Sequence, residues 1–260
     1  MRGRPRAGLS GATVTTFTPA AAGVKVVTVA PDNPARGLPR IQAAYLLFDR
    51  ETLALRAVLD GTALTTLRTP AVSVAAVLPA LPDRPLRVAV VGAGPQATGH
   101  VATLAAVRPL AGATHLLRDP SRTPLDAVRL GSAGADEALR AADVVVCATS
   151  ARAPVFDSSL LRDGAVVVAV GSHEPDAREL DAALLGRATV VVEDVATALR
   201  EAGDVVLAIA EGALTADDLV PVRDVVTGAI PPPADRPLVF KSVGMSWQDL
   251  VVAAAVVESG

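Results

Sequence analysis

The sequence predicts an α/β protein in which a doubly wound parallel sheet interrupts a smaller, mainly β region. Residues 86–100, LRVAVVGAGPQATGH, read as a buried strand, a glycine turn and the start of a helix. From there to about residue 228, apolar strand-like runs alternate with helical stretches, which is typical of a parallel sheet covered on both faces. Proline-rich segments at 79–85 and 230–233 bound this region.

The composition argues against several classes of protein. A hydrophobic content of 51% and a formal charge of −3 argue against disorder and against a nucleic-acid surface. No apolar run approaches the length of a membrane span, and the basic N-terminus is not followed by an apolar signal core, so we expect a soluble, cytoplasmic protein. The single cysteine, Cys147, lies in an apolar run and is expected to be buried. His100, His115 and His173 are too scattered to indicate a metal site.

The first third of the chain reads mainly as sheet. Residues 23–29, GVKVVTV, have strand composition and carry Lys25. Two β-rich runs at 41–48 and 53–59, separated by the polar run DRET, predict a hairpin.

A helix is predicted over residues 65–78, just before the first proline-rich boundary. Thr69 is able to cap it, and Pro70 is tolerated in a first turn but not deep inside a helix. Arg68 is therefore expected near the start of this helix.

Strands and helices are then expected to alternate. The predicted strands are 114–117, 143–148, 165–170 and 188–192, and the helical stretches are 136–141, 158–161 and 195–202. After the second boundary, PLVFKSVGMSWQDLVVAAAVV predicts a strand, a glycine turn and an apolar helix that returns to pack on the first third. We therefore divide the chain into residues 1–85, 86–230 and 231–260, with the first and last parts forming one domain.

The glycine turn has the pattern of a dinucleotide-binding site. Gly92 permits a tight turn, Gly94 lets the backbone approach a pyrophosphate, and Ala97 allows the helix to pack closely on the strand. Pro95 can open the helix, whose N-terminus offers free N–H groups to phosphates. The alternative is an ordinary glycine-rich turn, which the βα units downstream argue against.

The residues after the second strand of this region indicate which dinucleotide binds. An acidic residue about 20 positions past the glycines usually contacts an unphosphorylated ribose, but counting on from Ala97 leads to Leu117. Arg118 and Arg122 follow, and their guanidinium groups would surround a 2′-phosphate, so NADP(H) is expected in preference to NAD(H). The alternative is that both arginines are solvated loop charges and that Asp119 binds the ribose.

Basic residues are unevenly chosen. Of 24 lysine and arginine residues only two are lysines, Lys25 and Lys241. This bias indicates that a lysine is present only where a compact ammonium group is needed. The alternative is that the two lysines remain by chance.

Taken together, these stretches resemble the ornithine cyclodeaminase and mu-crystallin family over nearly the whole chain. The resemblance rests on seven ordered motifs: GVKVVTVAPDNPARGLP, LTTLRTPAVSVAA, VGAGPQATGH, ADVVVCATSARAPVF, VGSHEPDARELD, VVVEDVATALREAGD and VFKSVGMSWQDLVVAA. It implies a Rossmann-type NAD(P)-binding domain inserted in a discontinuous α+β substrate and dimerisation domain, and hence a homodimer. It also implies an oxidoreductase that moves hydride between nicotinamide and the α-carbon of a small amino or imino acid.

The resemblance also implies site residues, position by position. Lys25 and Arg68 match a lysine and an arginine at the substrate, where they would hold a carboxylate, and Arg6 matches more loosely an arginine before the substrate strand. The cofactor positions are Gly92, Gly94, Gln96 and Ala97 in the turn, with Thr149, Val170, Val243 and Gly244 beside the nicotinamide.

The chain departs from the cyclodeaminases after residue 170. Where those enzymes have an aspartate that handles the substrate amine, this chain has His173, with Ser172 as a second candidate. Imidazole donates and accepts protons near neutral pH, so proton transfer is retained while deamination is less favoured. The chain is also N-terminally short for the family.

We therefore expect NADP(H)-dependent reduction of an imino acid (a ketimine), or the reverse amino-acid oxidation, with Lys25 and His173 as catalytic residues. An ornithine or lysine cyclodeaminase that recycles NAD is the first alternative. A non-catalytic protein that binds NADP(H) and a small ligand is the second, and the presence of Lys25 and Arg68 argues against it.

Overall fold

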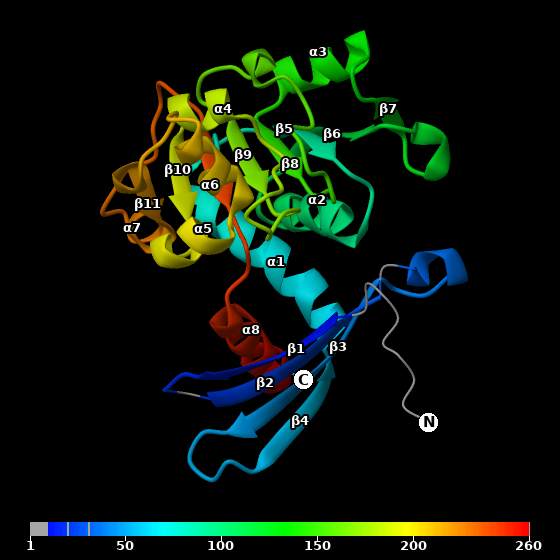
Figure 1. Cartoon of the computed structure of the whole chain (residues 1–260), viewed down its shortest axis with the longest axis vertical. Coiled ribbons are helices and arrows are strands. Elements are labelled where there is room, and N and C mark those ends of the chain that lie inside the picture. Colours follow the sequence, from blue (N-terminus) through cyan, green and yellow to red (C-terminus); the bar gives the residue numbers. More distant parts are fainter. Residues whose placement is uncertain (1–9, 20, 31, 260) are drawn as a thin grey trace. The chain divides into compact units, whose positions relative to one another are not determined.

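The computed structural model describes residues 10–19, 21–30 and 32–259, and the chain forms two compact units (Figure 1). The small unit comprises Met1–Arg68 and Met245–Gly260, and the large unit comprises Thr69–Gly244. The large unit contains the predicted parallel sheet, so the α/β fold class is confirmed.

The small unit is a four-stranded antiparallel sheet with a helix on one face. Its strands lie in the order β1 Ser10–Phe17, β2 Ala21–Val29, β3 Ile41–Asp49 and β4 Leu55–Asp60. The predicted hairpin is confirmed as β3 and β4, which pair antiparallel. Helix α8, Ser246–Ser259, lies against these strands (red in Figure 1), with Leu250 and Ala253 buried beside Tyr45 and Leu47. The last helix therefore packs on the first third, as predicted.

The large unit contains an eight-stranded parallel sheet in the order β11-β10-β12-β9-β8-β5-β6-β7. Its strands are β5 Leu86–Val91, β6 Leu110–Leu117, β7 Ala127–Arg129, β8 Val144–Cys147, β9 Val166–Ala169, β10 Thr189–Val192, β11 Leu219–Pro221 and β12 Leu238–Lys241. The helices between them are α2 Pro95–Val107, α3 Ala133–Ala141, α4 Ala182–Arg187, α5 Val195–Glu201, α6 Gly203–Ala210 and α7 Val222–Val226. Short 3-10 helices are η2 Leu78–Ala80, η3 Pro120–Arg122, η4 Ser158–Leu160 and η5 Ala216–Asp218, with η1 Asn33–Arg36 in the small unit.

Apolar side chains cover both faces of the large sheet. Ala89 and Val91 of β5 belong to one buried cluster, and Val88 and Val90 belong to the other. Because successive side chains of a strand point to opposite faces, this explains the unbroken apolar run that the sequence shows there. Cys147 lies in the first cluster, and burial raises the pKa of its thiol well above the ordinary value, so the thiol is unreactive as well as buried.

Helix α1, Gly61–Val77, begins before the predicted start. Asp60 Oδ1 accepts hydrogen bonds from two amides of the first turn, at 2.8 and 3.1 Å, so Asp60 and not Thr69 caps the helix. Pro70 consequently lies inside the helix. The prediction was wrong because it placed the first turn by the proline, whereas an interior proline removes one helical hydrogen bond and is tolerated where packing compensates.

Together with η2, this helix also corrects the prediction about membrane spans. Gly61–Ala80 is long and apolar enough to cross a membrane by length and composition, but 44% of its apolar 18-residue portion is buried inside the structure. Its residues Val74 and Val77 pack in the second apolar cluster with Val88 and Val90. A core helix of this kind passes the same test, so it is weak evidence for a membrane span.

The divisions between the units differ from the boundaries predicted after residues 85 and 230. The first division falls inside α1, after Arg68, and the second follows Gly244. Strand β12 lies between β9 and β10 in the large sheet, so it is not part of the returning segment. The prolines mark loops that lead into strands of the large sheet, because a residue without an N–H donor is excluded from central strands.

Candidate active site

The glycine turn after β5 is tight on one side and open on the other. Gly92 has φ +127°, and a Cβ there would lie 2.7 Å from the carbonyl oxygen of Ala148, so only glycine fits. At Gly94, no described atom lies within 4 Å of the position that a Cβ would take. Gly94 precedes Pro95, the first residue of α2, and Ala97 in the first turn of α2 is buried. Open backbone beside a helix N-terminus fits a pyrophosphate.

Two histidines support this turn, which the sequence did not predict. His115 of β6 donates from Nδ1 to the carbonyl oxygen of Gly92 at 2.8 Å. His100 donates from Nδ1 to the carbonyl oxygen of Gln96 at 2.7 Å, and burial lowers its pKa to about 4, so it is neutral at physiological pH. Within the part of the chain that the structure describes, no group of three or more His, Cys, Asp or Glu side chains could hold a metal.

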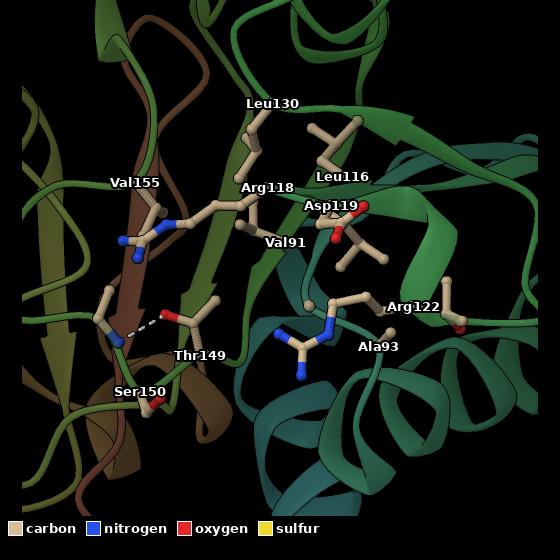
Figure 2. Close-up of a pocket in the computed structure, with 14 residues that line it drawn as sticks. Val91, Ala93, Leu116, Arg118, Asp119, Arg122, Leu130, Thr149, Ser150 and Val155 are labelled. Atoms are coloured by element: carbon tan, nitrogen blue, oxygen red, sulfur yellow. Dashed lines mark hydrogen bonds between the residues drawn. The ribbon is translucent and has the colours of Figure 1, made fainter.

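A pocket of about 440 Å³ lies beside the turn, and Figure 2 shows its lining. Arg118, Asp119 and Arg122 line it together with Gly92. Asp119 Oδ1 accepts hydrogen bonds from the amide (3.2 Å) and hydroxyl (2.7 Å) of Ser121, and these bonds hold the pKa of the carboxyl below its usual range. The two guanidinium groups and the one carboxylate therefore line the same pocket.

Further polar groups follow the carboxyl ends of β8 and β9, neighbouring strands at the centre of the sheet. Thr149 donates to Glu179 Oε1 from both its amide and its hydroxyl, each at 2.7 Å, and Gly171 donates from its amide to Oε2 at 2.7 Å. Glu179 is fully buried, and this burial raises its pKa although Lys241 and Thr149 oppose the shift. One buried carboxylate thus ties together the ends of two strands.

Lys241 at the end of β12 extends this network. Its Nζ lies 3.0 Å from Asp204 Oδ2 and donates to the carbonyl oxygen of Ser172 at 2.6 Å. Neither side chain of the pair is exposed to solvent. Asp204 Oδ1 accepts hydrogen bonds from the amides of Glu179 (2.7 Å) and Leu180 (2.8 Å). Burying both charges is tolerated because each is paired and hydrogen-bonded.

A third carboxylate organises the segment after β12. Glu193, which follows β10, accepts hydrogen bonds from the amides of Val243 and Gly244 and from the Ser242 hydroxyl, all at 2.9 Å. Gly244 has φ +85°, which favours glycine. The backbone at both predicted cofactor positions is therefore fixed by a carboxylate that the prediction did not include.

The two predicted proton-transfer candidates, Ser172 and His173, lie in the loop after β9 and differ in exposure. His173 is exposed. Ser172 is buried, and its hydroxyl donates to the backbone carbonyl oxygens of Ala177 (2.6 Å) and Glu174 (3.3 Å). Ser172 therefore shapes the loop, and His173 is the group accessible to a ligand. Val170 donates from its amide to the carbonyl oxygen of Cys147 at 3.0 Å and so continues the strand pairing.

The small unit carries a separate charged cluster. Lys25 Nζ donates to Thr65 Oγ1 at 2.6 Å and to Asp249 Oδ1 at 3.0 Å. Arg68 Nε lies 3.3 Å from the same Oδ1, and Arg68 Nη1 donates to Gln248 Oε1 at 2.9 Å. The structure thus brings the two predicted carboxylate-binding residues to one aspartate. Arg6, the third predicted member, lies outside the described residues.

Sequence reasoning missed Asp249, although one signal was present. Asp249 lies four residues before Ala253 on α8, so the two share a helix face, and Ala253 is fully buried. An acidic residue on an apolar face requires a cationic partner.

A model of the ornithine cyclodeaminase/mu-crystallin family matches residues 13–260 of this chain. Among curated proteins, Δ(1)-pyrroline-2-carboxylate reductase 2 of Burkholderia ambifaria is 35% identical over 241 residues, which cover 87% of this chain and 73% of that protein. The ketimine reductase mu-crystallin of Mus musculus is 34% identical over 241 residues, which cover 90% of this chain and 75% of that protein.

The fold has a counterpart among solved structures. The Δ(1)-pyrroline-2-carboxylate reductase of Thermococcus litoralis, in complex with NADH and L-proline, superposes with a TM-score of 0.82 at 26% identity. The match covers 96% of this chain and 86% of that one.

Proposed function

Because the chain belongs to the ornithine cyclodeaminase/mu-crystallin family, we propose that it reduces an α-imino acid to the amino acid with NADP(H). The substrate class is a ketimine that carries one α-carboxylate, such as Δ1-pyrroline-2-carboxylate, and the reverse direction is oxidation of the amino acid. The observation that carries the proposal is the pair of cations on Asp249 in the small unit. Reductases named for pyrroline-2-carboxylate and for ketimines among the relatives support it.

Substrate binding is assigned to Lys25 and Arg68. The planar guanidinium of Arg68 matches the two oxygens of a carboxylate, and the ammonium of Lys25 adds a compact charge beside it. Anchoring the carboxylate orients the neighbouring C=N bond, and such orientation is a large part of catalysis for a substrate this small.

Proton transfer is assigned to His173. NADPH, when bound, would supply the hydride that goes to the imine carbon, and His173 would supply the one proton that the nitrogen needs for C=N to become CH–NH. His173 is exposed after the carboxyl end of β9, the edge at which ligands bind in parallel sheets. Imidazolium gives a proton near neutral pH and takes one back in the reverse direction.

A nicotinamide dinucleotide fits the large unit, and preference for NADP(H) is the finer part of the proposal. Arg118 and Arg122 line the pocket with exposed side chains, whereas Asp119 is engaged by Ser121. The pyrophosphate is assigned to Gly92, Gly94, Gln96 and Ala97, and the nicotinamide to Thr149, Val170, Val243 and Gly244. NAD(H) bound through Asp119 is the alternative.

A homodimer is part of the same proposal. The face of the small sheet opposite α8 carries apolar side chains that water reaches: Phe17, Val26 and Val58 are 58%, 41% and 64% exposed. Exposed apolar side chains on one face of a sheet are typical of a subunit interface. Light scattering after size exclusion should give twice the mass of the chain. We also place the enzyme in the cytoplasm as a soluble protein.

The decisive experiment follows nicotinamide absorbance with NADPH and Δ1-pyrroline-2-carboxylate. We expect oxidation of NADPH in proportion to enzyme and formation of proline. Release of ammonia from ornithine without added reductant, at an ordinary enzymatic rate, would identify a cyclodeaminase instead. Tight cofactor binding without turnover on any cyclic imine or keto acid with amine would identify a binding protein.

A further inference from the structure

Asp249 is the third member of the charged cluster in the small unit, and its carboxylate has two cationic partners. Oδ1 lies 3.0 Å from Lys25 Nζ and 3.3 Å from Arg68 Nε. The side chain of Asp249 is 6% exposed, and those of both partners are 11% exposed. One oxygen atom therefore fixes the separation of two cations that would otherwise repel each other at low exposure.

We infer that Asp249 is a positioning residue that holds the Lys25 ammonium and the Arg68 guanidinium together as one binding site for a single carboxylate group. The inference rests on the proposed function, in which these two residues bind the carboxylate of the imino acid. Asp249 itself does not touch the substrate in this arrangement.

Both cations keep donors for a ligand. Lys25 has three N–H groups, and Thr65 and Asp249 accept from two of them. Among the described residues, Arg68 Nη1 donates to Gln248 and Nε lies at ion-pair distance from Asp249 without a hydrogen bond, which leaves Nη2 for a carboxylate. The three charges sum to one positive charge, which matches one carboxylate. An aspartate that only tied α8 to the sheet would need no such open donors.

Asp249 also influences the protonation of Lys25. Burial lowers the pKa of Lys25 from its ordinary value, the Asp249 carboxylate opposes this shift, and Arg68 adds to it. The groups facing Lys25 are Asp249 on α8, Arg68 and Thr65 on α1, and Tyr45 on β3, whose pKa burial and Asp249 raise to about 12 so that it stays neutral.

Replacing Asp249 by asparagine therefore lowers the pKa of Lys25 further. Only the protonated amine binds a carboxylate, so the variant loses activity at a lower pH than the wild type as the pH rises.

The test compares Asp249→Asn with Glu258→Gln, which removes one exposed carboxylate from the same helix. Calorimetry measures L-proline binding to the NADP⁺-loaded protein, and steady-state kinetics give kcat and KM for Δ1-pyrroline-2-carboxylate across pH. We expect Asp249→Asn to weaken L-proline binding and raise KM about tenfold or more, and to move the alkaline limb of kcat/KM down by about one pH unit. NADPH affinity should not change, and Glu258→Gln should behave as wild type.

Asp249→Glu separates position from charge. It keeps the negative charge on a longer arm, so we expect the alkaline limb to stay in place while L-proline binding weakens. If Asp249→Asn does not fold, Asp249→Glu still tests the inference. An L-proline affinity of Asp249→Glu equal to that of the wild type would contradict a positioning role.

Unchanged or tighter L-proline binding by Asp249→Asn would overturn the inference, since losing a negative charge strengthens a purely electrostatic attraction for an anion. Wild-type protein that binds L-proline but does not reduce the imine would refute the proposed function and still leave the binding comparison to test Asp249. Wild-type protein that binds no carboxylate ligand would overturn both.

Discussion

Each of the two lysines of this chain forms an ion pair with an aspartate, but the two pairs differ in their exposure to solvent. Lys25 and Lys241 each lie 3.0 Å from an aspartate oxygen. The Lys25 side chain is 11% exposed and shares its aspartate with Arg68, whereas neither Lys241 nor Asp204 is exposed at all. An ion pair with a second cation and open donors is suited to bind an anion. The fully buried pair of Lys241 and Asp204 instead holds the end of β12 and the loop after β9 in place.

The largest effect is expected from breaking the fully buried pair. Lys241→Met leaves Asp204 buried without a compensating charge, so the free energy of unfolding should fall by about 3–5 kcal/mol. Denaturation in urea measures this loss. Adding Asp204→Asn removes the second charge while keeping an acceptor for two backbone amides, and it should recover part of the stability. If Lys241→Met alone is as stable as the wild type, Lys241 has no structural role that distinguishes it from Lys25.

Lys25→Ala should show the opposite profile. Loss of the proposed charge-assisted contact between Lys25 and the substrate should lower kcat/KM for the imine by about 100-fold, with NADPH affinity retained. Stability should fall by less than in Lys241→Met, because Arg68 remains as a partner for Asp249. Fluorescence titration with NADPH and urea denaturation check the two controls. A folded variant that no longer binds NADPH would show that Lys25 also serves the cofactor.

The loop held by Lys241 provides a third comparison. Lys241 donates to the Ser172 carbonyl oxygen, immediately before His173. His173→Asn should depress reduction about tenfold, less than a shielded general acid would, because His173 is exposed and water can deliver protons in its place. A proton donor acts only in its protonated form, so the size of the loss should change with pH. Equal loss at all pH values would show that the histidine only shapes the loop.

The smallest effect concerns the cofactor. If Arg118 binds a 2′-phosphate as proposed, Arg118→Ala should reduce the ratio of NADPH affinity to NADH affinity about fivefold, because an exposed charge contributes little to binding. The Lys25 variant should leave this ratio unchanged, because Lys25 and the pocket lie in different units. Tighter binding of NADH than NADPH by the wild type would support the alternative in which Asp119 binds the ribose.

Local patterns predicted the parallel sheet, the hairpin and the glycine turn, because each depends on neighbouring residues and on side-chain periodicity. The start of α1 was missed because an aspartate cap outweighed the proline rule. The carboxylates that organise the polar groups were missed for a different reason. Lys25 and Asp249 are 224 positions apart, and only the return of α8 to the first sheet joins them. The hydrogen bonds and ion pair of Glu179 and Asp204 likewise depend on the order of the strands in the sheet, which the sequence alone did not predict.

The difference in exposure between the lysines also makes them chemical reporters. Apart from the α-amino group, an amine-reactive reagent has only these two targets in the chain. Lys25 is the reachable one in the folded protein, and its lowered pKa favours the reactive free amine. Loss of the mass shift on the Lys25 peptide when L-proline is added would therefore record occupancy of the proposed carboxylate site. Modification of Lys241 would record unfolding in the same digest, since its amine is reached only when the large sheet opens.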